Sequence, residues 1–394
     1  MSNYSNTIFN QLLSFLPRDR FNYFVGQHKG DMNIKRMTAW NHFTVMLYAQ
    51  IASKKSLRDI ETGMKLHEGC WHHLGIKTVA KSSIADANRR RSYQIFEKLF
   101  YALLERCKEI TPHREFDFEN KLYSLDASVI NLCLSTFDWA KYRTTKGALK
   151  LHVLLDNRTA LPELINITDG KTADIKKLQD LDVKTLEKGS IIVFDRAYID
   201  YEKWKELDEN GLTFVSRTKK SQNIFVVGQN IEKDKLEKDI LADEIVMFGS
   251  YDVIEKEKYP KNLRRVKYYD KEKQKEYVYL TNNFKLNAKQ IADIYKDRWQ
   301  IELFFKWIKQ NLKIKTFLGT SKNAVMTQIW IAMIYYLLVA YIKFQTKFKN
   351  SLLELTRMVR ETIMFRRNLI DLLSLTTETV FKLKLEKSPQ MSFW

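Results

Sequence analysis

Apolar side chains recur at helical spacing through the first quarter of the chain. Residues 40–52 mix them at intervals of three and four, and residues 83–104 have the pattern of a longer helix. A short helix is predicted to begin at Ser56, because Asp59 follows three residues later in the style of a capping box. We therefore expect residues 1–117 to form a helical domain.

The pattern changes to alternation after residue 120, and strand-forming residues become frequent. The run SIIVF at residues 190–194 is continuously apolar, as expected of a strand that is covered on both faces. Three neighbouring strands followed by alternating helices and strands predict a mixed α/β sheet over residues 118–217. The strands are predicted at residues 121–133, 149–155, 161–168, 190–194 and 212–217, and the helices at residues 172–181 and 198–209.

Residues 218–285 are again rich in strand patterns, with no strong helix after Leu241. The run of Lys, Arg and Glu at residues 256–275 is typical either of a solvated hairpin or of a surface that faces DNA, and both alternatives stay open. We interpret the whole stretch as a β-rich insertion. Its strands are predicted at residues 223–227, 244–248, 265–269 and 276–280.

A long helix is predicted to run from Asn287, a favourable N-cap residue, to about Leu312. The uncharged segment that follows, residues 329–342, has 14 residues. A membrane-spanning helix needs about 20 apolar residues, so a buried core helix and no membrane partner are expected. Residues 286–345 thus return to the core, and residues 346–394 are expected to form a C-terminal helical region.

The charge balance indicates the kind of partner. The chain has 66 Lys and Arg against 47 Asp and Glu, a formal net charge of +19. A polyanion explains such a surplus best, since each cation near a phosphate releases counterions; a generic basic protein is the alternative. The three cysteines lack paired spacing, and the first residues lack the pattern of a signal peptide, so a reducing cytoplasm is expected.

Polar residues form a stripe along the helix predicted after residue 287. Their offsets are 0, 3, 7, 11 and 14, which places all of them on one face. An ordinary amphipathic helix with salt bridges four residues apart would have the same spacing, so the stripe alone leaves both readings open. The five residues are Tyr295, Arg298, Glu302, Lys306 and Lys309.

Two aspartates stand in apolar strand patterns, where a carboxylate is costly unless it is paired or bound to metal. Asp126 lies inside LYSLDASVI, and Asp195 ends the run SIIVF. Each could be satisfied by a local turn. Together with Glu302, however, they could hold two divalent cations about 4 Å apart, which activate a water or a 3′ hydroxyl for attack on a phosphate. Hard oxygen ligands suit Mg²⁺ or Mn²⁺.

The string Tyr295-x2-Arg298-x3-Glu302-x6-Lys309 resembles the signature helix of the bacterial "insertion sequence four" family of transposases, which are DDE cut-and-paste enzymes. Five further segments are similar to this family, and the resemblance covers about residues 35–345. Residues 56–60 (SLRDI) resemble the helical domain that precedes the core. Residues 195–198 (DRAY) resemble the motif around the second aspartate and residues 125–128 (LDAS) the motif around the first; residues 146–152 and 168–174 are also similar.

The resemblance implies a fold and assigns residues to a chemistry. The expected fold class is α/β, with a ribonuclease-H-like catalytic core, the β-rich insertion, and flanking N-terminal and C-terminal helical regions, of which residues 1–117 would bind DNA. Two Mg²⁺ or Mn²⁺ ions would be bound by Asp126, Asp195 and Glu302. DNA phosphates would be contacted by Tyr295, Arg298, Lys309, Lys306 and Arg196, with Arg298 acting as a bidentate fork.

Such an enzyme would work in the bacterial cytoplasm, associated with the nucleoid. It would bind the terminal inverted repeats of an insertion sequence, cleave the DNA there and join the 3′ hydroxyl to target DNA. The resemblance implies a homodimer that holds two ends in a synaptic complex. Two other functions stay open: a ribonuclease-H-like DNA nuclease without strand joining, and a repeat-binding protein without catalytic activity.

The sequence also departs from the family pattern. Ala197 replaces the usual glycine of the second motif, and no tryptophan lies between Trp204 and Trp299, where some relatives use one to hold a flipped base. A Tyr or Phe of that segment could stack instead, or no hairpin intermediate forms. Trp299 itself is expected in the core. Residues 89–91, three arginines, either contact the terminal repeats or form a solvated face.

Overall fold

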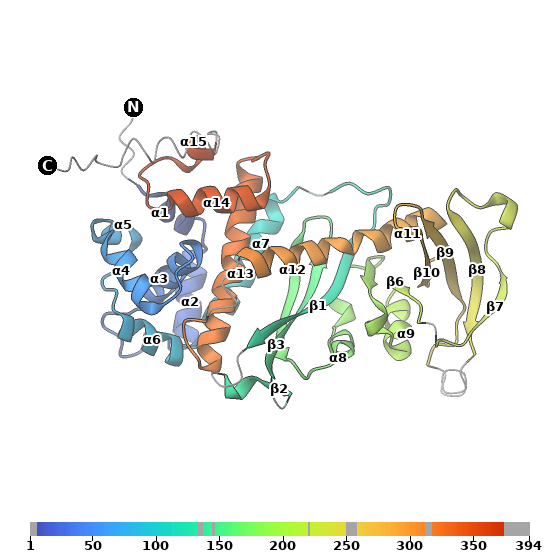
Figure 1. The fold of residues 1–394 in the computed structure, drawn as a ribbon, viewed down its shortest axis with the longest axis horizontal. Helices are drawn as coiled ribbons and strands as arrows, with labels where there is room; N and C mark the ends of the chain where they lie inside the picture. Colours follow the sequence, from blue (N-terminus) through green and yellow to red (C-terminus); the bar gives the residue numbers. More distant parts are fainter. Residues whose placement is uncertain are drawn as a thin grey trace. The chain divides into compact units, whose positions relative to one another are not determined.

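The computed structural model of the chain divides into two compact units (Figure 1). The helical unit comprises residues 1–112, 135–139 and 307–394, and the sheet unit comprises residues 113–134 and 140–306. The structure describes residues 6–112, 114–132, 137–143, 146–219, 221–249, 258–311 and 317–373. Cys133, residues 256–257 of the charged run and residues 374–394 of the predicted C-terminal region lie outside these ranges.

Side-chain caps begin several helices of the helical unit. The Thr38 side chain accepts the N–H of Asn41 at the start of α3, and the Ser56 side chain accepts the N–H of Asp59 at the start of α4, as predicted. The described helices are α1 (Ile8–Ser14), α2 (Arg18–Gln27), α3 (Ala39–Ile51), α4 (Leu57–Lys65), α5 (Trp71–Leu74), α6 (Lys81–Arg90), α7 (Gln94–Ile110), α13 (Lys322–Gln345), α14 (Leu352–Thr362) and α15 (Leu369–Leu373).

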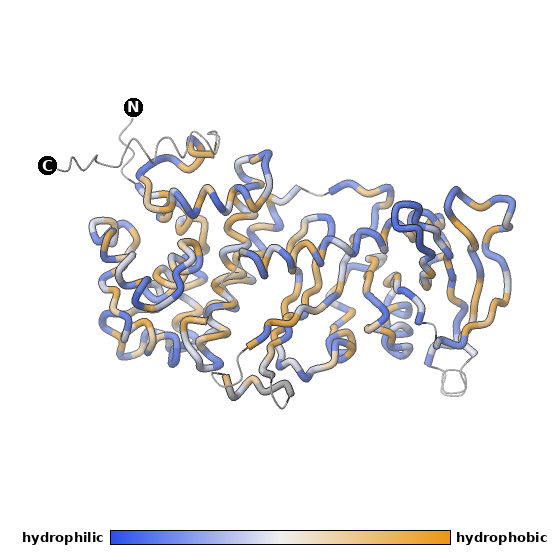
Figure 2. Tube along the Cα trace, in the orientation of Figure 1, coloured by the Kyte–Doolittle hydropathy of each residue, from blue (hydrophilic) through white to orange (hydrophobic). Residues whose placement is uncertain are grey.

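The uncharged segment forms the central helix of this unit, as predicted. Within the described residues, α13 is the one helix long and apolar enough to cross a membrane by length and composition, but 94% of its apolar window is buried inside the protein. It packs against α3, α6, α7 and α14, and apolar residues run along its length (Figure 2). The burial of all its faces marks α13 as a core helix.

The single helix predicted over residues 83–104 is wrong, because the chain forms two helices there. Arg91, between α6 and α7, has an extended backbone with φ −73° and ψ 123°. Its guanidinium is buried and donates to the backbone carbonyls of Gly30 at 3.1 Å and Met37 at 2.6 Å. Arg91 is therefore a structural residue, whereas Arg89 and Arg90 are exposed and pair with Asp86.

The first part of the sheet unit has the strand order of a ribonuclease-H-like core. β1 pairs with β3 antiparallel and β3 with β4 antiparallel, while β5 and β6 lie parallel to β1 on its other side. The predicted mixed α/β sheet is confirmed. The elements are β1 (Leu122–Leu132), β2 (Lys141–Arg143), β3 (Lys146–Asp156), β4 (Leu161–Asp169), α8 (Asp174–Gln179), β5 (Ile191–Phe194), α9 (Tyr201–Glu209) and β6 (Thr213–Arg217).

The central strand β5 is covered on both faces, as its continuous apolar run predicts. Ile192 and Phe194 pack in a cluster with Trp204 of α9. Ile191 and Val193 point the other way and pack in a second cluster with residues of α11 (Ala288–Asp297). Because side chains alternate along a strand, one face of the sheet packs under α9 and the other packs under α11.

The strands of the predicted insertion continue the same sheet. β10 pairs with β6 antiparallel, and β9, β8 and β7 follow in order. The strands are β7 (Ile224–Gln229), β8 (Ile240–Phe248), β9 (Leu263–Asp270) and β10 (Lys275–Thr281). The sheet therefore runs without a break across the expected boundary at residues 217–218, and the five-part division of the chain stays a prediction.

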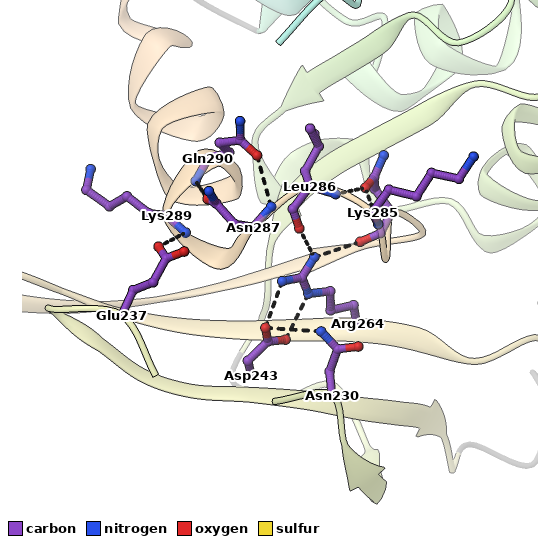
Figure 3. A network of polar contacts seen from close by, with 10 residues as sticks. Asn230, Glu237, Asp243, Arg264, Lys285, Leu286, Asn287, Lys289 and Gln290 are labelled. Atoms are coloured by element: carbon purple, nitrogen blue, oxygen red, sulfur yellow. Dashed lines mark hydrogen bonds and ion pairs between the residues drawn. The ribbon is translucent and has the colours of Figure 1, made fainter. Parts of the chain in front are cut away.

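A buried ion pair joins these outer strands to the start of α11 (Figure 3). Arg264 of β9 donates to both carboxylate oxygens of Asp243 on β8, at 2.8 and 2.7 Å, and both side chains are almost fully buried. The same guanidinium donates to the carbonyl oxygens of Asn283 and Leu286, in the loop that leads into α11. The capping box of Asn287 then begins the helix.

The helix predicted from Asn287 to about Leu312 is interrupted at Arg298, which is a correction to the sequence prediction. α11 ends at Asp297 and α12 (Trp299–Asn311) begins one residue later. The N–H groups of Arg298 and Ile301 donate to carbonyls three residues back, at Tyr295 and Arg298, instead of four. The carbonyl that Ile301 would otherwise use, that of Asp297, accepts a hydrogen bond from the side chain of Asn157, in the turn after β3.

We expect Asp243→Asn to destabilise the chain strongly. The substitution leaves the buried charge of Arg264 without its partner, which costs about 3–5 kcal/mol in buried pairs. Urea unfolding followed by circular dichroism measures the effect. As a control, Glu232→Gln breaks the exposed pair with Lys235 and should leave the midpoint unchanged. Equal midpoints for both variants would contradict a structural role of the buried pair.

Candidate active site

The two strand aspartates lie at the same end of neighbouring parallel strands. Leu125 on β1 pairs with Phe194 on β5, so Asp126 and Asp195 are the next residues on each strand. Neighbouring strands are about 4.8 Å apart. Side chains two residues apart on a strand lie on the same face of the sheet. Both aspartates therefore lie on the face that packs under α11. The sheet therefore brings together two carboxylates that are far apart in the sequence.

Local backbone groups satisfy one oxygen of each aspartate. Asp126 Oδ1 accepts the N–H of Ala127 at 2.8 Å. Asp195 Oδ1 accepts the N–H of Ala197 at 2.7 Å and caps a short 3₁₀ turn over Arg196–Tyr198. The turn-satisfied alternative is thus correct for one oxygen of each side chain. In Asp126 the second oxygen bonds a side chain from a distant part of the sequence.

Arg298 links this pair to the third predicted carboxylate. Its Nη1 donates to Asp126 Oδ2 at 3.0 Å, and its Nη2 donates to Glu302 Oε1. The Arg298 side chain is 17% exposed and its guanidinium carbon lies 5.7 Å from the centre of the Tyr295 ring. An ordinary amphipathic helix would account for the Arg298–Glu302 pair but not for the bond to Asp126, which joins the helix to the sheet.

Negative charge is concentrated around Asp126. The pKa of Asp126 is raised to about 6, first by burial and to a smaller extent by the like charges of Asp195 and Glu302, against the opposing effects of the Ala127 N–H and Arg298. The neighbouring Tyr198 hydroxyl is buried and its pKa is raised, first by burial and then by Asp126 and other carboxylates. Asp195 and Glu302 therefore both lie close enough to Asp126 to affect its pKa.

The donor set fits a divalent cation, although Arg298 now bonds two of its members. Three carboxylates supply hard oxygen ligands, and burial, the main cause of the raised pKa of Asp126, makes its charged form costly without a paired cation. Among the described residues, no three His, Cys, Asp or Glu side chains stand at metal-binding spacing. A cation at Asp126 and Glu302 would have to replace the Arg298 bonds.

The other residues predicted to contact DNA differ in exposure. Tyr295 is only 8% exposed and packs against Tyr279, with ring centres 4.8 Å apart. Arg196 and Lys306 are exposed side chains of the sheet unit. Lys309 is also exposed, further along α12 and within the helical unit.

A cavity of about 820 Å³ lies beside Arg298 and Glu302 in the sheet unit. Aromatic side chains from β9, β10, α11 and the segment before β1 line it, and the Arg217 guanidinium lies 5.0 Å from the Tyr277 ring centre. Trp299 also lines the cavity and is 55% exposed, so its predicted core position is wrong. The aromatic lining residues are Phe116, Phe118, Tyr268, Tyr277, Tyr279, Tyr295 and Trp299.

A second polar cluster lies on β3, where the sequence analysis placed a family-like motif. His152 Nε2 is 2.9 Å from Thr168 Oγ1, and its Nδ1 is 3.8 Å from Asp174 Oδ1. Burial lowers the pKa of His152 to about 4, which keeps the ring neutral. Lys150 Nζ lies 2.9 Å from the same Asp174 oxygen.

Sequence reasoning missed the residues around Asp297. Asn157 and Arg114 both bond Asp297, directly before Arg298. The sequence analysis assigns Asn157 no role, because it falls between two predicted strands, and no pattern in the sequence marks Arg114. Their part in the site depends on contacts between segments more than 100 residues apart, which no local spacing indicates.

The strand order is that of a ribonuclease-H-like core. Residues 117–338, more than half of the chain, match the family described as "Transposase DDE domain", and the chain belongs to this family of DDE transposases. Residues 4–77 match a second family, described as a domain of unknown function (DUF4372). The resemblance to insertion-sequence transposases is confirmed.

Curated relatives agree with this assignment. The chain is 33% identical over 292 residues to the "Putative transposase y4zB" of Sinorhizobium fredii, covering 73% of this chain and 78% of the relative. It is 26% identical over 273 residues to the "Probable transposase for insertion sequence element IS5377" of Geobacillus stearothermophilus, covering 69% and 70%. The enzymes of this family use divalent metal ions and bind DNA.

A solved structure aligns with most of the chain at a lower level of likeness. It is the "Cryo-EM structure of piggyBac transposase synaptic complex with hairpin DNA", with a TM-score of 0.47 and 10% sequence identity. The alignment covers 97% of this chain and 80% of that one. A likeness at this level assigns no fold, and the ribonuclease-H-like order rests on the strand pairing above.

We expect Asp126→Asn to change how stability depends on pH. Asp126 binds its proton more tightly in the folded chain, with a pKa of about 6 against 3.8 unfolded, so its contribution is full below 3.8 and is lost as pH rises through about 6. The variant lacks this loss. With a chelator present, the melting temperature of the variant minus that of the wild type should therefore increase from pH 5 to pH 8. The exposed Asp59→Asn serves as the control, and a parallel shift in both variants would contradict the raised pKa.

Proposed function

We propose that this chain excises an insertion sequence from DNA and joins it to a new site, with Asp126, Asp195 and Glu302 as the catalytic residues. The observation that carries the proposal is the pair of bonds from Arg298 to Asp126 and Glu302, next to Asp195. These bonds join two of the three acidic residues of the predicted motif, and the pairing of β1 with β5 supports placing Asp195 beside them.

The three carboxylates would hold two Mg²⁺ or Mn²⁺ ions. When bound, such ions activate the attacking oxygen and stabilise the leaving oxygen in an in-line displacement at phosphorus. The chain itself contributes orientation. Asp126 and Asp195 are fixed by strand pairing and by backbone N–H bonds, whereas Glu302 stands in the first turn of α12.

Cationic side chains around the carboxylates would hold the DNA. Arg298 offers a planar fork that matches a phosphate, and Arg196 and Lys306 are exposed cations on the same unit. Lys309, one more exposed cation of α12, would contact the DNA end as a point charge. The net charge of +19 supports a long polyanionic partner.

The expected DNA partners are the terminal inverted repeats of the element and a target duplex. Two ends must be held together for joint insertion, which supports a homodimer in the working complex. The aromatic cavity beside Glu302 has the chemistry to stack an unpaired base next to the cleaved bond, through Tyr or Phe in place of a tryptophan.

We expect Asp126→Asn, Asp195→Asn and Glu302→Gln each to abolish cleavage while DNA binding survives. Each substitution removes an anionic metal ligand but keeps the shape of the side chain. Cleavage of the DNA that flanks the gene is measured with Mg²⁺, and binding is measured by gel shift without metal. Glu276→Gln, an exposed carboxylate of β10, is the control and should cleave normally.

Loss of DNA binding in all three variants would mean that these residues are structural. Strand transfer is tested separately, with a precut end and a target plasmid. Joined products exclude a nuclease that only hydrolyses, and their absence in a chain that cleaves well would favour that alternative.

We expect Lys309→Ala to weaken binding of the DNA end and to flatten its salt dependence. A lost phosphate contact lowers the slope of log K against log salt by about 1. Fluorescence anisotropy at several salt concentrations measures the slope. Lys235→Ala removes another exposed lysine, one already paired with Glu232, and serves as the control. An unchanged slope in Lys309→Ala would contradict the phosphate contact.

A further inference from the structure

The interruption of the helix at Arg298 has a specific cause in the sheet unit. In a regular α-helix the N–H of Ile301 would donate to the carbonyl of Asp297. That carbonyl instead accepts the Nδ2 of Asn157 at 3.0 Å, and the N–H of Ile301 donates to the carbonyl of Arg298 at 3.2 Å. A side chain that takes a carbonyl out of the helical ladder produces such a tightened turn.

Asn157 also controls the side chain of Asp297. The same Nδ2 lies 2.9 Å from Asp297 Oδ2, and Arg114 Nη1 lies 2.6 Å from Asp297 Oδ1. The Asp297 side chain is 9% exposed, so a bare carboxylate there would attract the nearest cation. Because Asn157 and Arg114 satisfy it, the adjacent Arg298 is left to bond Asp126 and Glu302.

The position of Asn157 ties the break to the strand that carries the first aspartate. Asn157 follows β3 directly and is 2% exposed. Its backbone N–H donates to the carbonyl of Leu122, the first residue of β1, at 2.8 Å. One residue therefore bonds both β1, which carries Asp126, and the last residue of α11, which precedes Arg298.

We propose that Asn157 is a positioning residue for the active site, which bonds β1 and the end of α11 and thereby directs Arg298 and Glu302 toward Asp126. This role rests on the proposed function of the three carboxylates. Without the Asn157 amide, the Asp297 carbonyl is free to accept the N–H of Ile301, the turn becomes regular helix, and the first turn of α12, which carries Glu302, changes direction relative to β1. Glu302 then no longer faces Asp126.

The test is Asn157→Leu in the full chain, which keeps the size of the side chain and removes the donor. Residues that orient metal ligands typically contribute about 10–100-fold to metal affinity or activity. We expect the affinity for Mn²⁺, measured by electron paramagnetic resonance without DNA, to fall at least about 10-fold. We expect kcat for cleavage to fall by a similar factor, with KM for the DNA unchanged.

Asn282→Leu is the matched control. Asn282 Nδ2 also donates to one carboxylate and one carbonyl, at Asp208 (2.8 Å) and Leu212 (2.9 Å), but none of these residues bonds a predicted catalytic residue. It should lower the melting temperature at least as much as Asn157→Leu while Mn²⁺ affinity and kcat stay the same. Asp297→Asn keeps the backbone carbonyl that accepts the hydrogen bond from Asn157, and this variant should also retain its affinity for Mn²⁺.

Two failures can be told apart. If Asn157→Leu lowers only the melting temperature, as Asn282→Leu does, then the positioning role is wrong and Asn157 is merely structural. If the wild-type chain neither binds Mn²⁺ through Asp126 nor cleaves DNA, then the proposed function is wrong and the positioning role is overturned with it.

Discussion

The contact between Arg298 and two carboxylates is the interaction on which the site depends. Asp126, Asp195 and Glu302 carry like charges in a partly buried place, and the pKa of Asp126 is raised, first by burial and then by the other two carboxylates. A carboxylate in such surroundings takes up a proton or needs a cation. Arg298 supplies that cation from within the chain and bonds both the strand and the helix. The grouping of acids proposed for catalysis is thereby compatible with a folded chain.

The sheet and the helix pair supply the geometry that this contact requires. Parallel pairing of β1 and β5 fixes the two aspartates, and two polar networks fix α11 at its ends. The Arg264–Asp243 pair holds the loop before the helix, and Asn157 holds its last residue. The β-rich insertion is therefore part of the scaffold of the site, because its strands extend the central sheet and carry the first of these networks.

Much of this could be predicted from the sequence, because strands and caps leave local patterns. Alternation located nearly every strand, and the carboxylates were found from their apolar surroundings and their motif spacing. The break at Arg298 could not be predicted, since its polar stripe is equally typical of a continuous helix. Its cause is a hydrogen bond from Asn157, 140 residues away in sequence. The exposure of Trp299 was missed for a similar reason, because the cavity it lines is formed by distant segments.

The proposed chemistry places two demands on Arg298 that cannot be met together. A guanidinium bonded to Asp126 and Glu302 occupies the oxygens that a divalent ion needs, yet the same fork suits a DNA phosphate. If a divalent ion were held by the same oxygens, Arg298 would have to give up these bonds. If the ion replaced the guanidinium, the carboxylates would remain paired with a cation. The electrostatic cost of this exchange would be smaller than the cost of burying carboxylates that have no paired cation. The freed guanidinium stays beside the carboxylates because the turn at Asp297 is fixed by Asn157 and Arg114. Arrival of the metal would then prepare the phosphate site as well.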